Sequence, residues 1–403
     1  MGRRYWLLLG GYLVSSTGTW IYRLALPLMV LDMTGSALST GAVYALEYLP
    51  FLVLGVAGGV IADRFGRRRV LVAGDLAAGL FALALACLVS SGRPPLWLVY
   101  LLVLALSCVD PLYRPAFNAV VPSLVPPDRL PPANARVHIG EHGTNMLGPV
   151  LGGALIAAFG YQTAIYVDAA TFLLSAAMMA LIGEVPAAVT RGRSAMADLR
   201  EGLRFLFRER REVLVTAVAS CGLNFGVWLL LANVVYYLTA HHGFTPGQIG
   251  AVYAFQGAGA VTGGLLGSRL LRVLPPWALI SGGTALGGLS MLLMIPARGP
   301  VLIGLAWLGQ FAGAGIGIVA TVTVRQHLVP GHLLGRVLGT ARVIAFASIP
   351  LAALASGAFE TAVRNPAAMM AFAGASWLLI ALLLARSSLR DVRLAPQPRS
   401  LPG

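Results

Sequence analysis

Long apolar runs separated by short polar segments follow one another along the whole chain. A helix needs about 20 predominantly apolar residues to cross a bilayer, and each run is long enough for one crossing. The pattern therefore predicts an all-α membrane protein with twelve transmembrane helices. Their approximate ranges are 6–31, 39–61, 70–91, 95–121, 134–159, 161–183, 213–239, 247–271, 276–297, 300–323, 335–359 and 366–387.

The longest non-apolar stretch lies near the middle of the chain and divides the predicted spans six and six. We expect an N-terminal six-helix bundle (1–185), a cytoplasmic linker (186–212), a C-terminal six-helix bundle (213–390) and a cytoplasmic tail (391–403). Leucines and arginines in the linker recur at helical spacing, which predicts an amphipathic helix. Such a helix either lies on the membrane surface or is a solvated connector.

The two halves of the chain resemble each other. GGVIADRFGRR, from Gly58, aligns with GGLLGSRLLRV, from Gly263, and LVP at Leu124 recurs at Leu328 with nearly the same separation. Two independent matches indicate a duplicated six-span unit with pseudo-symmetric halves. Parallel repeats of this kind build transporters whose binding site lies between the halves at mid-membrane.

Composition and charge agree with a membrane protein. Of 403 residues, 58% are hydrophobic and 11% are charged, whereas soluble domains carry roughly a quarter charged residues. All 29 basic residues are arginine. Most of them fall at the termini and in loops on one side of the predicted membrane, which places both termini in the cytoplasm. This topology accounts for the net charge of +14 without a nucleic-acid partner.

One polar segment carries a recognisable motif. GVIADRFGRRRVL, residues 59–71, resembles the signature of the loop between spans two and three in the major facilitator superfamily. The matching positions are Gly59, Ala62, Asp63, Arg64, Gly66, Arg67 and Arg68. The resemblance implies a cytoplasmic gate in which Asp63 caps the helix that begins near Gly335. The arginines would then bridge to acids or lipid phosphates, or they fix the topology alone.

Other segments are similar to the drug and natural-product exporters of that superfamily, the branch with macrolide and siderophore efflux proteins. They are PSLVPPDRLPPANA, GPVLGG, REGLRFLFRER and LVPGHLLGRVLG. In GPVLGG, on span five, the matching residues are Gly148, Pro149, Gly152 and Gly153. Small residues at these positions allow helices to approach closely.

The resemblance implies a secondary active transporter, not an enzyme, in the plasma (inner) membrane of a prokaryote. It would export small amphipathic or lipophilic compounds by alternating access, usually as a proton antiporter. We expect a monomer without cofactor or metal. Relatives often carry Asp where this chain has Thr19, which leaves open a lipid-handling or scaffold protein of the same fold without proton-coupled efflux.

Ionisable residues inside the predicted spans are candidate functional groups, because charge is costly in the hydrocarbon core. All the acids among them lie in the first half. Arg23 and Glu47 are equally far along the chain from Gly35, the centre of the first outer loop. Two antiparallel helices with the same rise per residue place them at similar depth, which predicts an ion pair. The pair is either a static bridge, or Glu47 exchanges it for a proton during transport.

Further candidates lie on spans four, five and six. Asp110 and Arg114, spaced i, i+4, predict a structural bridge, and Asp168 is expected to be neutral and hydrogen-bonded. HIGEH, residues 138–142, matches a zinc-peptidase pattern. A zinc site needs a third ligand, for which the sequence offers no convincing candidate. We therefore interpret Glu141 and the histidines as part of a polar cavity or proton path.

The substrate cavity is expected between the inner halves of spans one, two, seven and eight. Its candidate residues, most of which are aromatics that could equally face lipid, are Trp20, Tyr44, Phe225, Trp228, Tyr253, Phe255 and Gln256.

Overall fold

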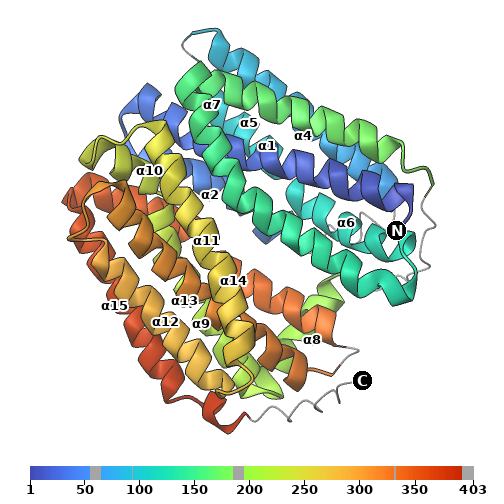
Figure 1. The fold of residues 1–403 in the computed structure, drawn as a ribbon, viewed down its shortest axis with the longest axis vertical. Coiled ribbons are helices and arrows are strands. Elements are labelled where there is room, and N and C mark those ends of the chain that lie inside the picture. The colour runs from blue at the N-terminus through green and yellow to red at the C-terminus, as the bar shows by residue number, and fades with distance from the viewer. Residues whose placement is uncertain (55–64, 93, 185–194, 331–332, 393–403) are drawn as a thin grey trace.

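The computed structural model describes residues 1–54, 65–92, 94–184, 195–330 and 333–392, and the side chains of 195–199 are not described. Every regular element in these ranges is helical, as the apolar pattern predicts (Figure 1). Ten segments of the described chain are long and apolar enough to cross a membrane.

The helices follow the predicted spans closely. The first half contains α1 (Arg3–Thr34), α2 (Ala37–Leu54), α4 (Arg67–Ser90), α5 (Leu96–Ser107), α6 (Asp110–Leu124) and α7 (Leu130–Ala180). The second half contains α9 (Arg211–Leu231), α11 (Pro246–Leu270), α12 (Pro276–Leu293), α13 (Gly299–Leu328), α14 (Leu334–Val363) and α15 (Pro366–Ala385). Shorter elements are η1 (Pro127–Arg129), α8 (Ala195–Arg208), α10 (Val234–Tyr236), the π-helical turn η2 (Tyr237–His241) and η3 (Ser388–Asp391).

The helix α7 covers two predicted spans. Gly160 departs from helical geometry within it, with φ 80° and ψ 167°. A positive φ is costly for residues with a side chain but not for glycine. The chain turns back on itself there (Figure 1), so the two spans predicted on either side of residue 160 run antiparallel.

The fourth predicted span, 95–121, is interrupted, although the whole stretch Leu96–Leu124 is long and apolar enough for one crossing. The helix α5 ends at Ser107, and α6 begins at Asp110. Pro111 has no N–H to bond the carbonyl of Ser107, four residues earlier, and its ring crowds that carbonyl. The break therefore follows from a proline that the hydropathy pattern hides.

The helices form two groups, coloured blue to green and yellow-green to red in Figure 1. In the first group α1 and α4 pack along α7, and in the second α13 packs between α11 and α12. The main contacts between the groups are α7 with α11 and α2 with α14. The ribbons diverge towards the end of the molecule that carries the N-terminus (Figure 1).

Glycines bring the two groups into backbone contact. A Cβ atom added to Gly250 of α11 would lie 2.7 Å from the Pro149 carbonyl oxygen and 3.3 Å from the Gly153 Cα of α7. A Cβ added to Gly41 of α2 would lie 2.6 Å from the Ala353 carbonyl oxygen of α14. Neither interface has room for a methyl group, so the groups pack as closely as their backbones allow.

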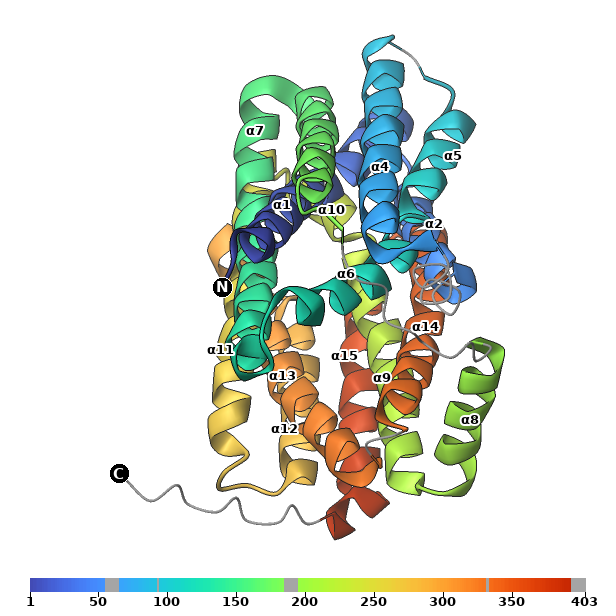
Figure 2. The same ribbon diagram turned by 90° about the vertical axis from the view of Figure 1, so that its right-hand side faces the viewer.

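The linker helix α8 packs against the second half (Figure 2). Its Leu206 is buried in a cluster with Val213 and Val337, and Arg336 Nη1 of α14 donates to Glu201 Oε2 at 2.5 Å. This apolar face was expected to lie on the membrane or to belong to a solvated connector. The structure packs it against α9 and α14 instead.

We predict that Gly250→Ala destabilises the protein or separates the two groups at this contact, because overpacking costs roughly 1–3 kcal/mol. Gly264→Ala is the matched control, since the same helix offers open space beside Gly264. Thermal unfolding and spin-label distances between α7 and α11 measure both effects. Equal behaviour of the two variants would contradict the packing argument.

Candidate transport site

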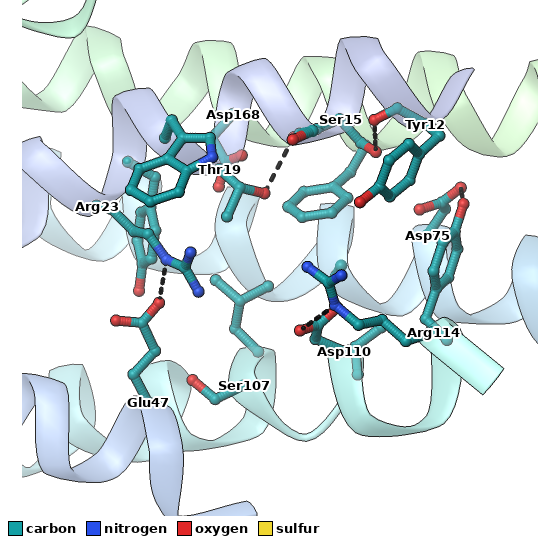
Figure 3. A pocket seen from close by; sticks show the side chains of 18 of the residues that line it. Tyr12, Ser15, Thr19, Arg23, Glu47, Asp75, Ser107, Asp110, Arg114 and Asp168 are labelled. Carbon is teal, nitrogen blue, oxygen red and sulfur yellow. Dashed lines mark hydrogen bonds and ion pairs between the residues drawn. The ribbon is translucent and has the colours of Figure 1, made fainter. Parts of the chain in front are cut away.

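A polar cavity of about 310 Å³ lies inside the first half. The helices α1, α2, α4, α6 and α7 contribute its ionisable side chains, many of which Figure 3 shows pointing inwards. These are Arg23, Glu47, Asp75, Asp110, Arg114, Glu141, His142 and Asp168. Carboxyl groups outnumber guanidinium groups in this cavity.

Arg23 and Glu47, which the sequence places at similar depth, are in contact. Arg23 Nε donates to Glu47 Oε1 at 2.5 Å (Figure 3), and the arginine also lies 5.0 Å above the centre of the Trp20 ring. Glu47 is 9% exposed. Each charge offsets part of the other's desolvation cost. Whether the pair is static or exchanges a proton stays a prediction.

A second cluster joins three helices. Arg114 Nε lies 3.2 Å from Asp110 Oδ1, as the i, i+4 spacing predicts. Arg114 Nη1 donates to Glu141 Oε1 at 3.5 Å, and the Tyr12 hydroxyl donates to the same oxygen at 2.6 Å. His138 Nδ1 is 3.1 Å from the other oxygen of Glu141. Glu141 therefore links α1, α6 and α7.

Zinc chemistry finds no support in this cluster. Within the described ranges no three histidine, cysteine or acidic residues are grouped so that they could hold a metal ion. The HIGEH segment instead provides Glu141 and His142 to the polar cavity.

Two buried acids gain importance from the structure. Asp75, 2% exposed, accepts hydrogen bonds from Ser175 Oγ at 2.6 Å and the Tyr113 hydroxyl at 3.3 Å. Asp168 is fully buried, and neither carboxylate oxygen has a hydrogen-bond partner among the described residues. The expectation that Asp168 is hydrogen-bonded is wrong. The sequence offered only the presence of these acids within spans, without their surroundings.

A smaller cavity, of about 70 Å³, lies between the two halves. Five of the seven substrate-cavity candidates line it, namely Trp20, Tyr44, Trp228, Tyr253 and Gln256. Phe225 and Phe255 line neither of these cavities. Phe255 packs instead against Gly304 of α13, where an added Cβ would lie 2.5 Å from the ring.

The Arg23–Glu47 pair lines both cavities. It therefore stands between the acidic interior of the first half and the aromatic space where the halves meet. A change in the charge of Glu47 therefore alters the electrostatic potential in both cavities.

The span-five glycines hold α7 against two neighbours. A Cβ added to Gly148 would lie 2.4 Å from the Trp20 Cβ, and one added to Gly152 would lie 3.1 Å from the Ile21 Cα. Gly153 faces Gly250 on α11 of the other half. The helix thus connects the site on α1 to the interface between the halves, and its part in transport stays a prediction.

The gate motif is only partly visible. Gly59, Asp63 and Arg64 lie outside the described residues. Gly66, with φ 85°, precedes α4. Arg67 Nη1 donates to the Ala119 carbonyl at 2.9 Å, and Arg68 Nη2 donates to the Ala180 carbonyl. These bonds connect the start of α4 to the ends of α6 and α7.

The second half contains buried charges that hydropathy did not assign to its spans. Glu360, 4% exposed, lies within α14 and is 2.9 Å from His241 Nε2, so the expectation that all span acids lie in the first half is wrong. Arg325, expected in a cytoplasmic loop, is buried within α13. It donates to Thr216 at 3.0 Å and to Ser220 at 3.2 Å.

The chain belongs to the Major Facilitator Superfamily, whose family model matches residues 8–353. It is accordingly a multi-pass membrane transporter with the helical fold of that family, in which the members are transporters rather than enzymes.

Several curated relatives are exporters. The chain is 29% identical to the multidrug efflux pump Tap of Mycobacterium tuberculosis (strain ATCC 25618 / H37Rv), over 97% of this chain and 95% of Tap. It is also 28% identical to the uncharacterized MFS-type transporter YfiS of Bacillus subtilis (strain 168), over 82% of this chain and 81% of YfiS. Macrolide efflux protein A of Streptococcus pyogenes is 23% identical over 73% and 74%. The names of Tap and macrolide efflux protein A agree with the exporter motifs in the sequence.

Solved structures share the fold at low identity. An inward-facing, unoccupied bacterial homolog of the human lysosomal transporter Spinster superposes with a TM-score of 0.77 at 14% identity, over 98% of this chain and 100% of that one. An auto-inhibited POT family peptide transporter gives 0.74 at 12% identity, over 100% and 99%.

We predict that Glu47→Gln and Arg23→Gln each destabilise the protein by roughly 3–5 kcal/mol, because each strands a buried charge. The double variant should recover most of this loss. Asp110→Asn is the control, since its side chain is 41% exposed and more exposed pairs contribute about 0–1 kcal/mol. Thermal unfolding of the four purified variants measures these effects. Wild-type stability of both single variants, Glu47→Gln and Arg23→Gln, would contradict the buried ion pair.

Proposed function

We propose that the protein is a secondary active exporter of small amphipathic compounds in the plasma (inner) membrane of a prokaryote. The observation that carries this proposal is the Arg23–Glu47 pair, which lines both the polar and the aromatic cavity. A proton-driven transporter needs a side chain whose protonation changes the electrostatics of the cargo site. Glu47 meets this requirement, because it lines the polar cavity and also the cavity between the halves. The exporter names of the relatives support the direction of transport.

The proposed topology has twelve spans and both termini in the cytoplasm. Ten described segments meet the criteria for spanning, and one of them contains the turn at Gly160 and so provides two crossings. The helix α1, 32 residues long, supplies the twelfth, because its polar residues face the cavity rather than lipid. Residues 1–185 and 213–390 then rock against each other around the glycine contacts.

Aromatic and amide side chains line the cavity between the halves and would determine which compounds bind there. Trp228 and Tyr48 contact across the halves with ring centroids 4.5 Å apart, and Gln256 accepts a hydrogen bond from Trp307 at 3.0 Å. Flat apolar surfaces with few fixed polar groups bind compounds that are partly apolar. The acidic cavity beside them favours cargo with a basic or hydrogen-bond-donating group.

Protonation of Glu47 is the proposed coupling step. A neutral Glu47 no longer balances Arg23, whose guanidinium then needs another acceptor. Asp168 lines the same cavity, lies within electrostatic reach of Arg23 and has two carboxylate oxygens without partners in the described chain. Arg23 would turn from α2 towards α7, and this motion loosens α1 from α2 while the halves exchange contacts.

The test is transport in vesicles with an imposed pH gradient, screened against lipophilic compounds. We expect uphill efflux by the wild type. The Arg23→Gln, Glu47→Gln double variant should fold and still move cargo downhill, but it should lose uphill efflux. Recovery of uphill transport in the double variant would make the pair purely structural. Absence of any pH-driven transport by the wild type would overturn proton coupling.

The gate is a separate proposal that rests on the motif in the sequence. Asp63 would cap α14, which begins at Leu334, when the cytoplasmic side is closed, because exposed amides at a helix N-terminus favour a carboxylate. We predict that Asp63→Asn abolishes transport and leaves membrane insertion intact. Near-normal efflux, measured at matched expression, would reduce this segment to a topology signal.

A further inference from the structure

A groove of about 510 Å³ opens on the surface of the first half, between α4 and the broken span formed by α5 and α6. We call it the α4 groove. Its walls are mostly apolar or small, with Val70, Ala77 and Phe81 on one side and Cys108 and Leu112 on the other. Its size falls within the range of about 300–1,000 Å³ typical of small-molecule sites.

The break in span four shapes this groove. Cys108 and Val109 in the break keep right-handed helical backbone angles, but Pro111 cannot donate a hydrogen bond to the Ser107 carbonyl. Val109, in the break, and Tyr113 line both the α4 groove and the polar cavity. The Tyr113 hydroxyl donates to Asp75 on the cavity side at 3.3 Å. One layer of side chains therefore separates an apolar groove from a buried acid.

A single cation marks one end of the groove. Arg69 is the only charged residue in its described lining. Its neighbours Arg67 and Arg68 donate to helix carbonyls. Arg69 is exposed and makes no hydrogen bond or ion pair with the described residues. Its guanidinium is thus available to an anion at the mouth of the groove.

The length of the groove matches that of an acyl chain. From Arg69 to Phe81 the helix α4 rises about 18 Å, at 1.5 Å per residue. One leaflet of the hydrocarbon core is about 15 Å thick, half of the whole. An acyl chain that fills the groove would therefore place its headgroup phosphate beside Arg69.

We propose that the α4 groove binds one acyl chain of an anionic phospholipid whose phosphate pairs with Arg69. The chain packs along α4 as far as Phe81 and covers the break at Cys108. It thereby supports Val109 and Tyr113, the wall that holds Asp75 in place. Lipid binding at this site can be measured without cargo and without a pH gradient.

Photo-crosslinking tests the proposal without a transport assay. The full-length protein is placed in phosphatidylcholine nanodiscs with a small fraction of phosphatidylglycerol carrying a diazirine on one acyl chain. After irradiation, peptide mass spectrometry locates the adducts. We expect them to concentrate on residues 70–81 and 105–112. Arg69→Gln should lower the yield there about fivefold, the factor given by the ~1 kcal/mol of one basic residue near anionic lipid.

Two further variants complete the design. Ala77→Phe should fill the groove and remove its adducts. Arg272→Gln is the matched control, because Arg272 is an exposed arginine of the second half, outside the groove, and it should leave the yield unchanged. Adducts spread evenly over the lipid-facing helices would overturn the proposal. So would a yield insensitive to both Arg69→Gln and Ala77→Phe, or an equal yield from a diazirine phosphatidylcholine.

Discussion

The cost of placing charge in a low-dielectric membrane governs the arrangement of this transporter. Arg23 and Glu47 offset part of that cost for each other, and Arg114 does the same for Asp110 and Glu141. The Arg23–Glu47 bridge joins α1 to α2, and the Arg114–Glu141 contact joins α6 to α7, so these charges also set which helices are neighbours. A buried ion pair is weak evidence for net stability. Its retention in a membrane bundle is better explained by a need for groups that can change partner.

Close helix packing provides the second constraint. Lipid tails are as apolar as leucine, so helices associate through tight packing and hydrogen bonds rather than through exclusion of water. The glycines at 148, 152 and 153 let α7 contact both α1 and α11. The helix that touches the ion-pair site also touches the opposite half. Because these contacts leave no room for a methyl group, a shift of α1 towards α7 is expected to displace α7 as well.

Hydropathy and arginine placement were sufficient for the class of fold and nearly all helix positions, because a membrane span is a property of a long window. The pairing of Arg23 with Glu47 was also accessible, since equal distances from a turn translate into equal depth. The break at Pro111 was missed because hydropathy averaged over a window of about 20 residues does not register a single proline. That α14 includes Glu360 and α13 includes Arg325 was also missed, because a charged residue lowers the local hydropathy. Hydropathy alone cannot distinguish a charged side chain that is paired inside the protein from one in a solvent-exposed loop. The loss of partners around Asp168 depends on packing between α1 and α7, which no local pattern encodes.

The unequal distribution of charge between the halves has a consequence for how such a transporter diversifies. The polar cavity belongs to the first half alone, whereas the aromatic cavity draws Trp228, Tyr253 and Gln256 from the second. After duplication of an ancestral six-helix unit, only the first copy would thus have kept the charged cavity, whereas both copies contribute aromatic side chains to the space between them. Substitutions on α9 and α11 can then alter which compounds are bound while the charged network on α1, α2, α6 and α7 is inherited intact. Transporters that descend from such an ancestor can therefore change their cargo through substitutions in the second half, while the first half keeps its charged residues.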